Sequence, residues 1–96
     1  MGTSRRPRPA RLASKLRQIR TSLGLTQEQM GELLTTRKSS VYPGHVSEFE
    51  RGKREPSLLA LLSYARAAGV PMDLLVDDKL DLPANLPGPQ NRHTGF

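Results

Sequence analysis

The spacing of the apolar residues is the feature that most constrains the fold of this chain. From residue 12 onward they recur three or four positions apart, as on one face of an α-helix, and the first such stripe is Leu12, Leu16, Ile19 and Leu23. No run alternates apolar and polar residues in the manner of a half-buried β-strand. A chain of 96 residues with this pattern predicts one compact all-α domain with a single small core.

Capping residues divide the apolar stripes into five short helices. Thr26 and Gln29 have the spacing of a capping box, and Pro43 suits the first turn of a helix because its missing N–H needs no partner there. Glycines at the expected helix ends supply the left-handed conformation. The predicted helices run from about Arg11 to Leu23, from Thr26 to Leu34, from Pro43 to about Arg51, from Ser57 to Ala68 and from Met72 to Val76.

The predicted core is built from the inward apolar positions of these helices. Gly31 costs the second helix about 1 kcal/mol relative to alanine, so we interpret it as a position where another helix packs closely. Residues 35–42 are polar and basic without a helical period and are predicted to form an elongated loop. The residues assigned to the core include Leu12, Leu16, Ile19, Met30, Leu33, Leu34, Val46, Phe49, Leu58, Leu61, Leu62, Ala65 and Ala68.

Both ends of the chain lack an apolar period. Residues 1–10 contain prolines and are predicted to be a flexible basic arm, which leaves residues 11–76 as the folded domain. Residues 77–96 contain three prolines and are predicted to be an extended or disordered tail. The leucines of that tail are either disordered or candidates to pack on the fourth or fifth helix of a partner chain. They are Leu80, Leu82 and Leu86.

Positive charge is concentrated in the first part of the chain. The net charge is +6, and residues 1–27 contain seven basic residues and no acidic one, whereas acidic residues predominate after Gly69. This asymmetry indicates a polyanion partner for the first part, although a solvated basic surface would give the same pattern. The chain has no cysteine, no export signal and no run of about 20 apolar residues, so we expect a cytoplasmic location without membrane association.

The sequence offers no constellation for catalysis. His45 and Glu48 are three positions apart on a predicted helix, but two ligands without a third do not form a metal site. Ser47 lacks a positioned base, because residues two apart do not face each other on a helix. No glycine-rich phosphate loop is present. We therefore predict no catalytic residue, no metal and no cofactor.

Several short motifs occur in the order and near the spacing of a known family. They are Arg20 four residues before Gly24, the run Gly24–Gln27, the run Val46–Gly52, the pair Pro56–Ser57, and the run Ala65–Val70. Together they resemble the lambda-repressor-like helix-turn-helix family of the Cro/cI or XRE type, over roughly residues 12–76. The interval from Gln27 to Glu50 is longer than in that family by about five residues, so the usual tight turn becomes a longer loop.

The resemblance implies that the third helix enters the major groove of DNA and that Arg20 and Glu50 form an ion pair between the first and third helices. A groove-reading helix must expose its first turn, and Val46 and Phe49 form its buried side. The residues expected to contact bases are Tyr42, Gly44, His45, Ser47 and Glu48. The residues expected to contact phosphates are Gln27, Arg37 and Lys38, then Arg51, Lys53 and Arg54, and in the arm Arg5, Arg6 and Arg8.

The sequence thus predicts a DNA-binding transcription regulator that acts as a dimeric repressor on a double-stranded operator. The alternative is an antitoxin-type protein-interaction module whose tail, residues 77–96, neutralises a toxin partner. A third interpretation is a non-specific binder of nucleic acid, which would have equal affinity for every sequence. Selection of bound sequences from random duplex DNA separates the first interpretation from the third.

Overall fold

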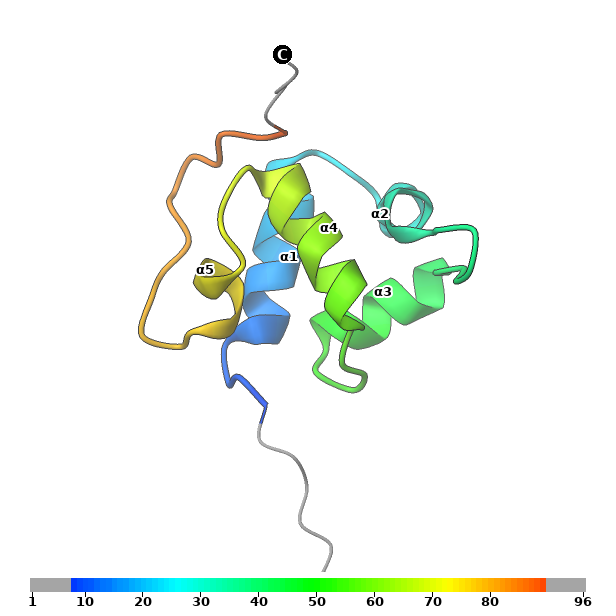
Figure 1. Cartoon of the computed structure of the whole chain (residues 1–96), viewed down its shortest axis with the longest axis horizontal. Coiled ribbons are helices and arrows are strands. Elements are labelled where there is room, and N and C mark those ends of the chain that lie inside the picture. Colours follow the sequence, from blue (N-terminus) through cyan, green and yellow to red (C-terminus); the bar gives the residue numbers. More distant parts are fainter. Residues whose placement is uncertain (1–7, 90–96) are drawn as a thin grey trace, which may run out of the picture.

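The computed structural model describes residues 8–89, and every regular element in that range is an α-helix (Figure 1). The helices are α1 (Leu12–Ser22), α2 (Gln27–Leu34), α3 (Pro43–Glu50), α4 (Leu58–Ala68) and α5 (Asp73–Val76). Each lies close to its predicted bounds, so the all-α fold class is confirmed. None of the helices within residues 8–89 is long and apolar enough to cross a membrane.

Local capping explains where most of the helices begin and end. The Thr26 hydroxyl accepts a hydrogen bond from the Gln29 N–H at 3.0 Å, and the Gln29 side chain accepts one from the Thr26 N–H at 2.9 Å. These two bonds form the predicted capping box of α2. The Ser57 hydroxyl accepts from the Ala60 N–H at the start of α4, and Gly69 ends that helix with a φ of 74°. Helix α1 differs, because its N-cap residue supplies no side-chain bond.

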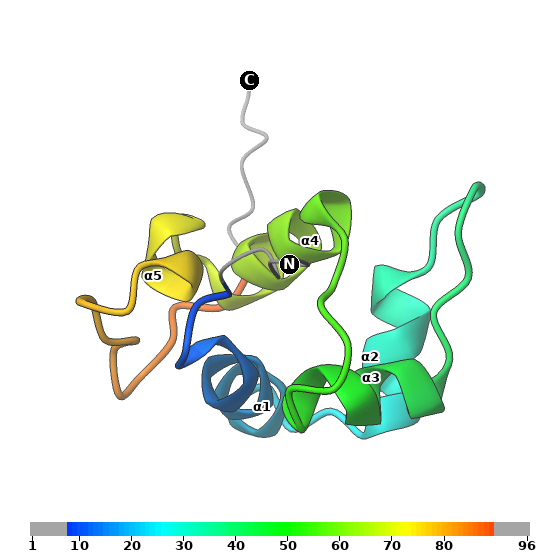
Figure 2. The same cartoon turned by 90° about the horizontal axis from the view of Figure 1, so that it is seen from below.

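The core lies where α4 crosses α1, with α5 on one side of α1 and with α2 and α3 on the other (Figures 1 and 2). Most predicted core residues are buried, but Leu33 and Leu58 are 42% and 74% exposed and Leu62 is half-buried. Those three assignments were wrong. In α2, Met30 and Leu34 share the inward side with Gly31, and helical geometry turns Leu33 away from it.

The buried side chains that the sequence did not predict include two with polar groups, Tyr64 and Lys15. Tyr64 in α4 is fully buried, and its hydroxyl has no hydrogen-bond partner in the part of the chain that the structure describes. Lys15 in α1 is only 2% exposed, and its ammonium group donates to the backbone oxygens of Leu74 at 2.7 Å and Asp77 at 3.0 Å. Lys15 therefore satisfies carbonyl groups at the C-terminal end of α5, which have no partner within the helix itself.

The loop between α2 and α3 is held by Thr35, the residue that follows α2. The Thr35 hydroxyl donates to the Gly31 oxygen and accepts from the Val41 N–H, each at 2.9 Å. A Cβ atom at Gly31 would lie 2.6 Å from the Val41 oxygen. The predicted close approach at Gly31 is therefore confirmed, but the approaching group is the loop backbone and not another helix. Figure 2 shows the loop rising from α2 and α3 toward the level of α4.

The segment after α5 packs against the domain. Residues 77–89 contain no helix or strand, and Figure 1 shows them running past α5 and back to the end of α4. Leu82 is 8% exposed within the core, Leu86 packs against it, and the Gly88 N–H donates to the Ala68 oxygen at 3.0 Å. Leu82 and Leu86 are thus used by the core of their own chain, which corrects the expectation that they pack on a partner chain.

Candidate nucleic-acid interface

The outward side of α3 is free of the core. Val46 and Phe49 are buried, as predicted, while Pro43 and Gly44 are exposed and His45, Ser47 and Glu48 are partly exposed. A Cβ atom at Gly44 would meet nothing within 4 Å, so this side of the first turn faces open space. With 100° between successive residues, the outward side of α3 is centred on the positions 44, 47, 48 and 51.

An ion pair fixes α3 to α1. The Arg20 Nε and Nη2 groups donate to the two carboxylate oxygens of Glu50 at 2.6 and 3.0 Å. The third bond of the guanidinium runs from Nη1 to the Leu25 oxygen at 2.9 Å. The side chains of Arg20 and Glu50 are 15% and 5% exposed, and their bidentate bond raises the pKa of Arg20. The pair therefore holds the outward side of α3 in a fixed orientation to the first two helices.

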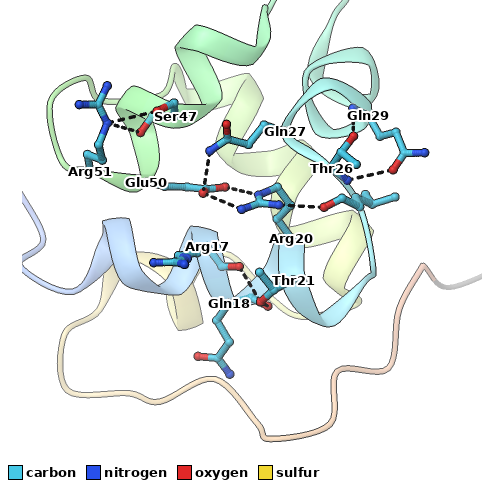
Figure 3. A network of polar contacts seen from close by, with 11 residues as sticks. Arg17, Gln18, Arg20, Thr21, Thr26, Gln27, Gln29, Ser47, Glu50 and Arg51 are labelled. Carbon is cyan, nitrogen blue, oxygen red and sulfur yellow. Dashed lines mark hydrogen bonds and ion pairs between the residues drawn. The ribbon is translucent and has the colours of Figure 1, made fainter.

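Gln27 connects α2 to the same ion pair. Its Nε2 group donates to Glu50 Oε1 at 3.3 Å, so the amide lies over the Arg20–Glu50 bond (Figure 3). The second N–H of this amide and its carbonyl oxygen have no hydrogen-bond partner within the described residues, so they can bind a phosphate. Because α2 begins at Gln27, the first-turn N–H groups that the capping box does not use, those of Gln27 and Glu28, lie at the same place. The expected phosphate contact at Gln27 thus coincides with a side chain that is already oriented.

A shallow depression forms where α1, α2 and α3 meet. Its lining residues are Arg17, Arg20, Gln27, Ser47, Glu50 and Arg51. Arg17 was not among the residues expected to contact DNA, although its position three residues before Arg20 places both on one side of α1. Arg17 has no ion-pair partner in the described residues, and the Arg51 guanidinium bonds only to Ser47 (Figure 3). Gln27 is therefore flanked by two cations that form no ion pair within the described residues.

The first turn of α3 is ordered by His45. The Tyr42 N–H donates to His45 Nδ1 at 3.2 Å, and the two rings lie 5.5 Å apart at a tilted angle. A neutral imidazole that accepts at Nδ1 carries its proton at Nε2. The Nε2–H of His45 is therefore the group with which this side chain can donate to a partner.

Two outward side chains of α3 pair with basic residues at or beyond its end. Glu48 Oε1 accepts from Arg54 Nε at 2.6 Å, and the Ser47 hydroxyl accepts from Arg51 Nε at 3.1 Å. The hydrogen bond from Arg54 lowers the pKa of Glu48, which keeps this carboxylate ionised at neutral pH. The second carboxylate oxygen of Glu48 and the hydroxyl hydrogen of Ser47 are not used in these two pairs.

Of the six expected phosphate-contacting cations within the described residues, four lie at or beside the turn after α3. We call Arg51, Lys53 and Arg54 the basic turn; all three are exposed. Arg8 lies beside it, with Nη1 3.5 Å from the Gly52 oxygen and Nε 3.8 Å from Glu55 Oε1. Arg5 and Arg6 lie outside the described residues.

The remaining pair of expected contacts stands apart from this group. Arg37 and Lys38 belong to the loop between α2 and α3, which rises on the α4 side of the molecule (Figure 2). The structure does not bring these two residues to the depression or to the basic turn.

Comparison with known proteins agrees with the geometry. A helix-turn-helix family model matches residues 16–75, which is more than half of the chain. No curated protein and no solved structure gives a significant match. The matched range begins within α1 and ends within α5, so it includes the depression, the outward side of α3 and the basic turn. The chain therefore belongs to the lambda-repressor-like, XRE-type helix-turn-helix family of DNA-binding transcription regulators.

Proposed function

We propose that this regulator is a cytoplasmic repressor that binds a specific operator as a dimer, with the outward side of α3 in the major groove. The observation that carries the proposal is the arrangement around the Arg20–Glu50 pair. The pair and Gln27 hold three helices together, and Ser47 of α3 and the cations Arg17 and Arg51 line the same surface.

Base reading is assigned to the partly exposed side chains of α3, helped by Tyr42. The His45 Nε2–H can donate to guanine O6 or N7, and the free oxygen of Glu48 can accept from cytosine N4. Ser47 can donate its hydroxyl hydrogen, and Gly44 lets the backbone approach a base edge closely. Each well-made contact of this kind discriminates by about 1–3 kcal/mol. With few such groups, sequence-dependent DNA shape contributes to the specificity as well.

Phosphate binding is assigned to Gln27, Arg8 and the basic turn, and we now add Arg17. Arg5 and Arg6 are proposed to act with them from the arm. Arg37 and Lys38 are proposed to reach a phosphate outside the region that α3 covers, so their contribution is expected to be smaller.

The phosphate assignment is tested with two matched double variants. Arg17→Ala/Arg51→Ala and Arg37→Ala/Lys38→Ala each remove two positive charges. The long-range attraction that depends on the net charge of the protein therefore falls equally in both variants. Affinity for a duplex of mixed sequence is measured over a series of KCl concentrations. We expect the first variant to flatten the slope of log affinity against log salt by about 0.9 per lost contact and the second to flatten it less. Equal slopes in both variants would refute the placement of DNA at the depression.

The base-reading assignment is tested with an operator selected from random duplexes and a scrambled duplex of the same composition. His45→Ala and Glu48→Ala should each weaken binding to the selected operator by roughly 5- to 150-fold. His45→Ala should leave binding to the scrambled duplex unchanged, and Glu48→Ala should tighten it slightly because a negative charge is removed. An equal loss on both duplexes would show that α3 positions the protein without reading bases.

Dimerisation would place two α3 helices about 34 Å apart, one turn of the duplex, and a bound dimer would block polymerase sterically. Leu58 and Leu59, at 74% and 67% exposed, are the leucines most available to a partner chain. A monomer in sedimentation experiments, both free and on the selected operator, would contradict the dimer.

The antitoxin alternative requires a free tail, whereas Asp78 and Leu82 already bond to or pack on their own chain, so we propose the repressor.

A further inference from the structure

The two residues just before α1 are bonded to a residue near the other end of the chain. Asp78 Oδ2 accepts from the Ala10 N–H at 2.8 Å, and Oδ1 accepts from the Arg11 N–H at 3.0 Å. A carboxylate at this place is stabilised by both bonds and by the positive end of the helix dipole. These two N–H groups hold the pKa of Asp78 below its ordinary value. Asp78 thus fixes the entry into α1 from 67 residues away along the chain.

The Arg11 side chain also bonds to the segment that contains Asp78. Its Nη1 group donates to the Asp78 backbone oxygen at 2.9 Å, and its Nη2 group forms an ion pair with Asp81. We call Asp78 and Asp81 the acidic clamp. The clamp is itself fixed to the domain, because buried Lys15 bonds to the Asp77 oxygen and Leu82 is part of the core. A segment with anchors on both sides can hold α1 and the residues before it in one place.

The residues before α1 are held from the opposite side by the turn after α3. Arg8 approaches the Gly52 oxygen at 3.5 Å and Glu55 at 3.8 Å, next to the basic turn. Residues 8–11, which we call the arm root, therefore lie between the acidic clamp and the basic turn.

We propose that Asp78, assisted by Asp81, is a positioning residue for DNA binding that fixes the arm root beside the basic turn and thereby directs Arg5 and Arg6 to the DNA backbone. The inference rests on the proposed function, in which the arm contacts phosphates. Three residues span at most about 11 Å, so the position of Arg8 limits which phosphates Arg5 can reach. Releasing the root lowers the effective concentration of the arm at those phosphates.

The test is a double-mutant cycle between the clamp and the arm, made in the otherwise full chain. Asp78→Ala is combined with deletion of residues 2–7, and affinity is measured for a duplex of mixed sequence at fixed KCl. Asp73→Ala is the matched control, because it removes the same charge from an exposed aspartate that makes no side-chain hydrogen bond in the described residues. Binding is measured at a temperature well below the melting transition of every variant, so that loss of the Asp78 bonds does not unfold the domain.

We expect Asp78→Ala to weaken binding by about two- to tenfold relative to Asp73→Ala in the full chain, and to have no effect once residues 2–7 are deleted. Asp81→Asn changes a largely exposed side chain. It should also weaken binding only when residues 2–7 are present, but by a smaller factor. This variant replaces Asp78→Ala in the test if Asp78→Ala does not fold. An equal loss with and without the arm, or no loss in the full chain, would overturn the inference. If deletion of residues 2–7 alone leaves affinity unchanged, the proposed arm contact itself is wrong.

Discussion

Removal of the Glu50 carboxylate is the most informative change to the stability of the domain. Glu50→Ala deletes the acceptor of three hydrogen bonds, two from Arg20 and one from Gln27. The guanidinium of Arg20, with a side chain only 15% exposed, would then keep a single bond to the Leu25 oxygen. A mostly buried charge without its counter-ion is costly because water replaces the lost partner only in part.

The magnitude follows from this burial. Removing one member of a buried pair costs about 3–5 kcal/mol, and the partial access of Arg20 to water places this pair near the lower value, about 3 kcal/mol. In a domain of this size 1 kcal/mol shifts the Tm by roughly 4–8 °C, so the expected decrease is about 12–24 °C. Since a small domain has about 5–15 kcal/mol of stability in total, Glu50→Ala should fold but melt early.

Thermal melting followed by circular dichroism measures the effect. The matched control is Glu48→Ala, which removes the same side chain two residues earlier on α3 from an exposed pair with Arg54. The Tm of this control should stay close to that of the parent because water screens exposed pairs. Glu50→Gln, which keeps the shape and one acceptor oxygen, should fall between the two variants. If Glu50→Ala melts like Glu48→Ala, the reasoning from burial is refuted.

Three further predictions concern packing and protonation. Gly31→Ala should lower the Tm although alanine favours helices, because its Cβ would lie 2.6 Å from the Val41 oxygen; an unchanged Tm would show that the loop yields. Tyr64→Phe should keep or raise the Tm, since it removes a buried hydroxyl without a partner in the described residues. The hydrogen bonds to Asp78 and Asp81 lower the pKa of each carboxyl in the folded state. The stability that these ionised carboxylates add to the fold is therefore complete above the ordinary pKa of about 3.9 and is lost as the pH falls through the lower pKa of the folded state. The Tm difference between the parent and Asp78→Ala should therefore shrink in acid, and a constant difference would contradict this.

The sequence by itself determined the helices and most of the core. The capping box of Thr26 and Gln29, the cap at Ser57 and the left-handed Gly69 act within a few residues of the helix ends, so their spacing is visible in the chain. Apolar periodicity likewise identified the buried sides of α1 and α3. It failed at Leu33, because a helix of two turns carries too few apolar residues to define its inward side.

Only the tertiary structure decided the contacts between distant parts of the chain. The bonds of Asp78 to the residues before α1, the bond of Lys15 to α5 and the return of Leu82 to the core join residues that no local pattern relates. The candidate site shows the same division. The residues proposed to read bases follow from their place on α3, whereas Arg17 became part of the surface only when α1, α2 and α3 came together. Local hydrogen bonds depend on spacing along the chain, but ion pairs and core contacts depend on which segments the hydrophobic collapse brings side by side.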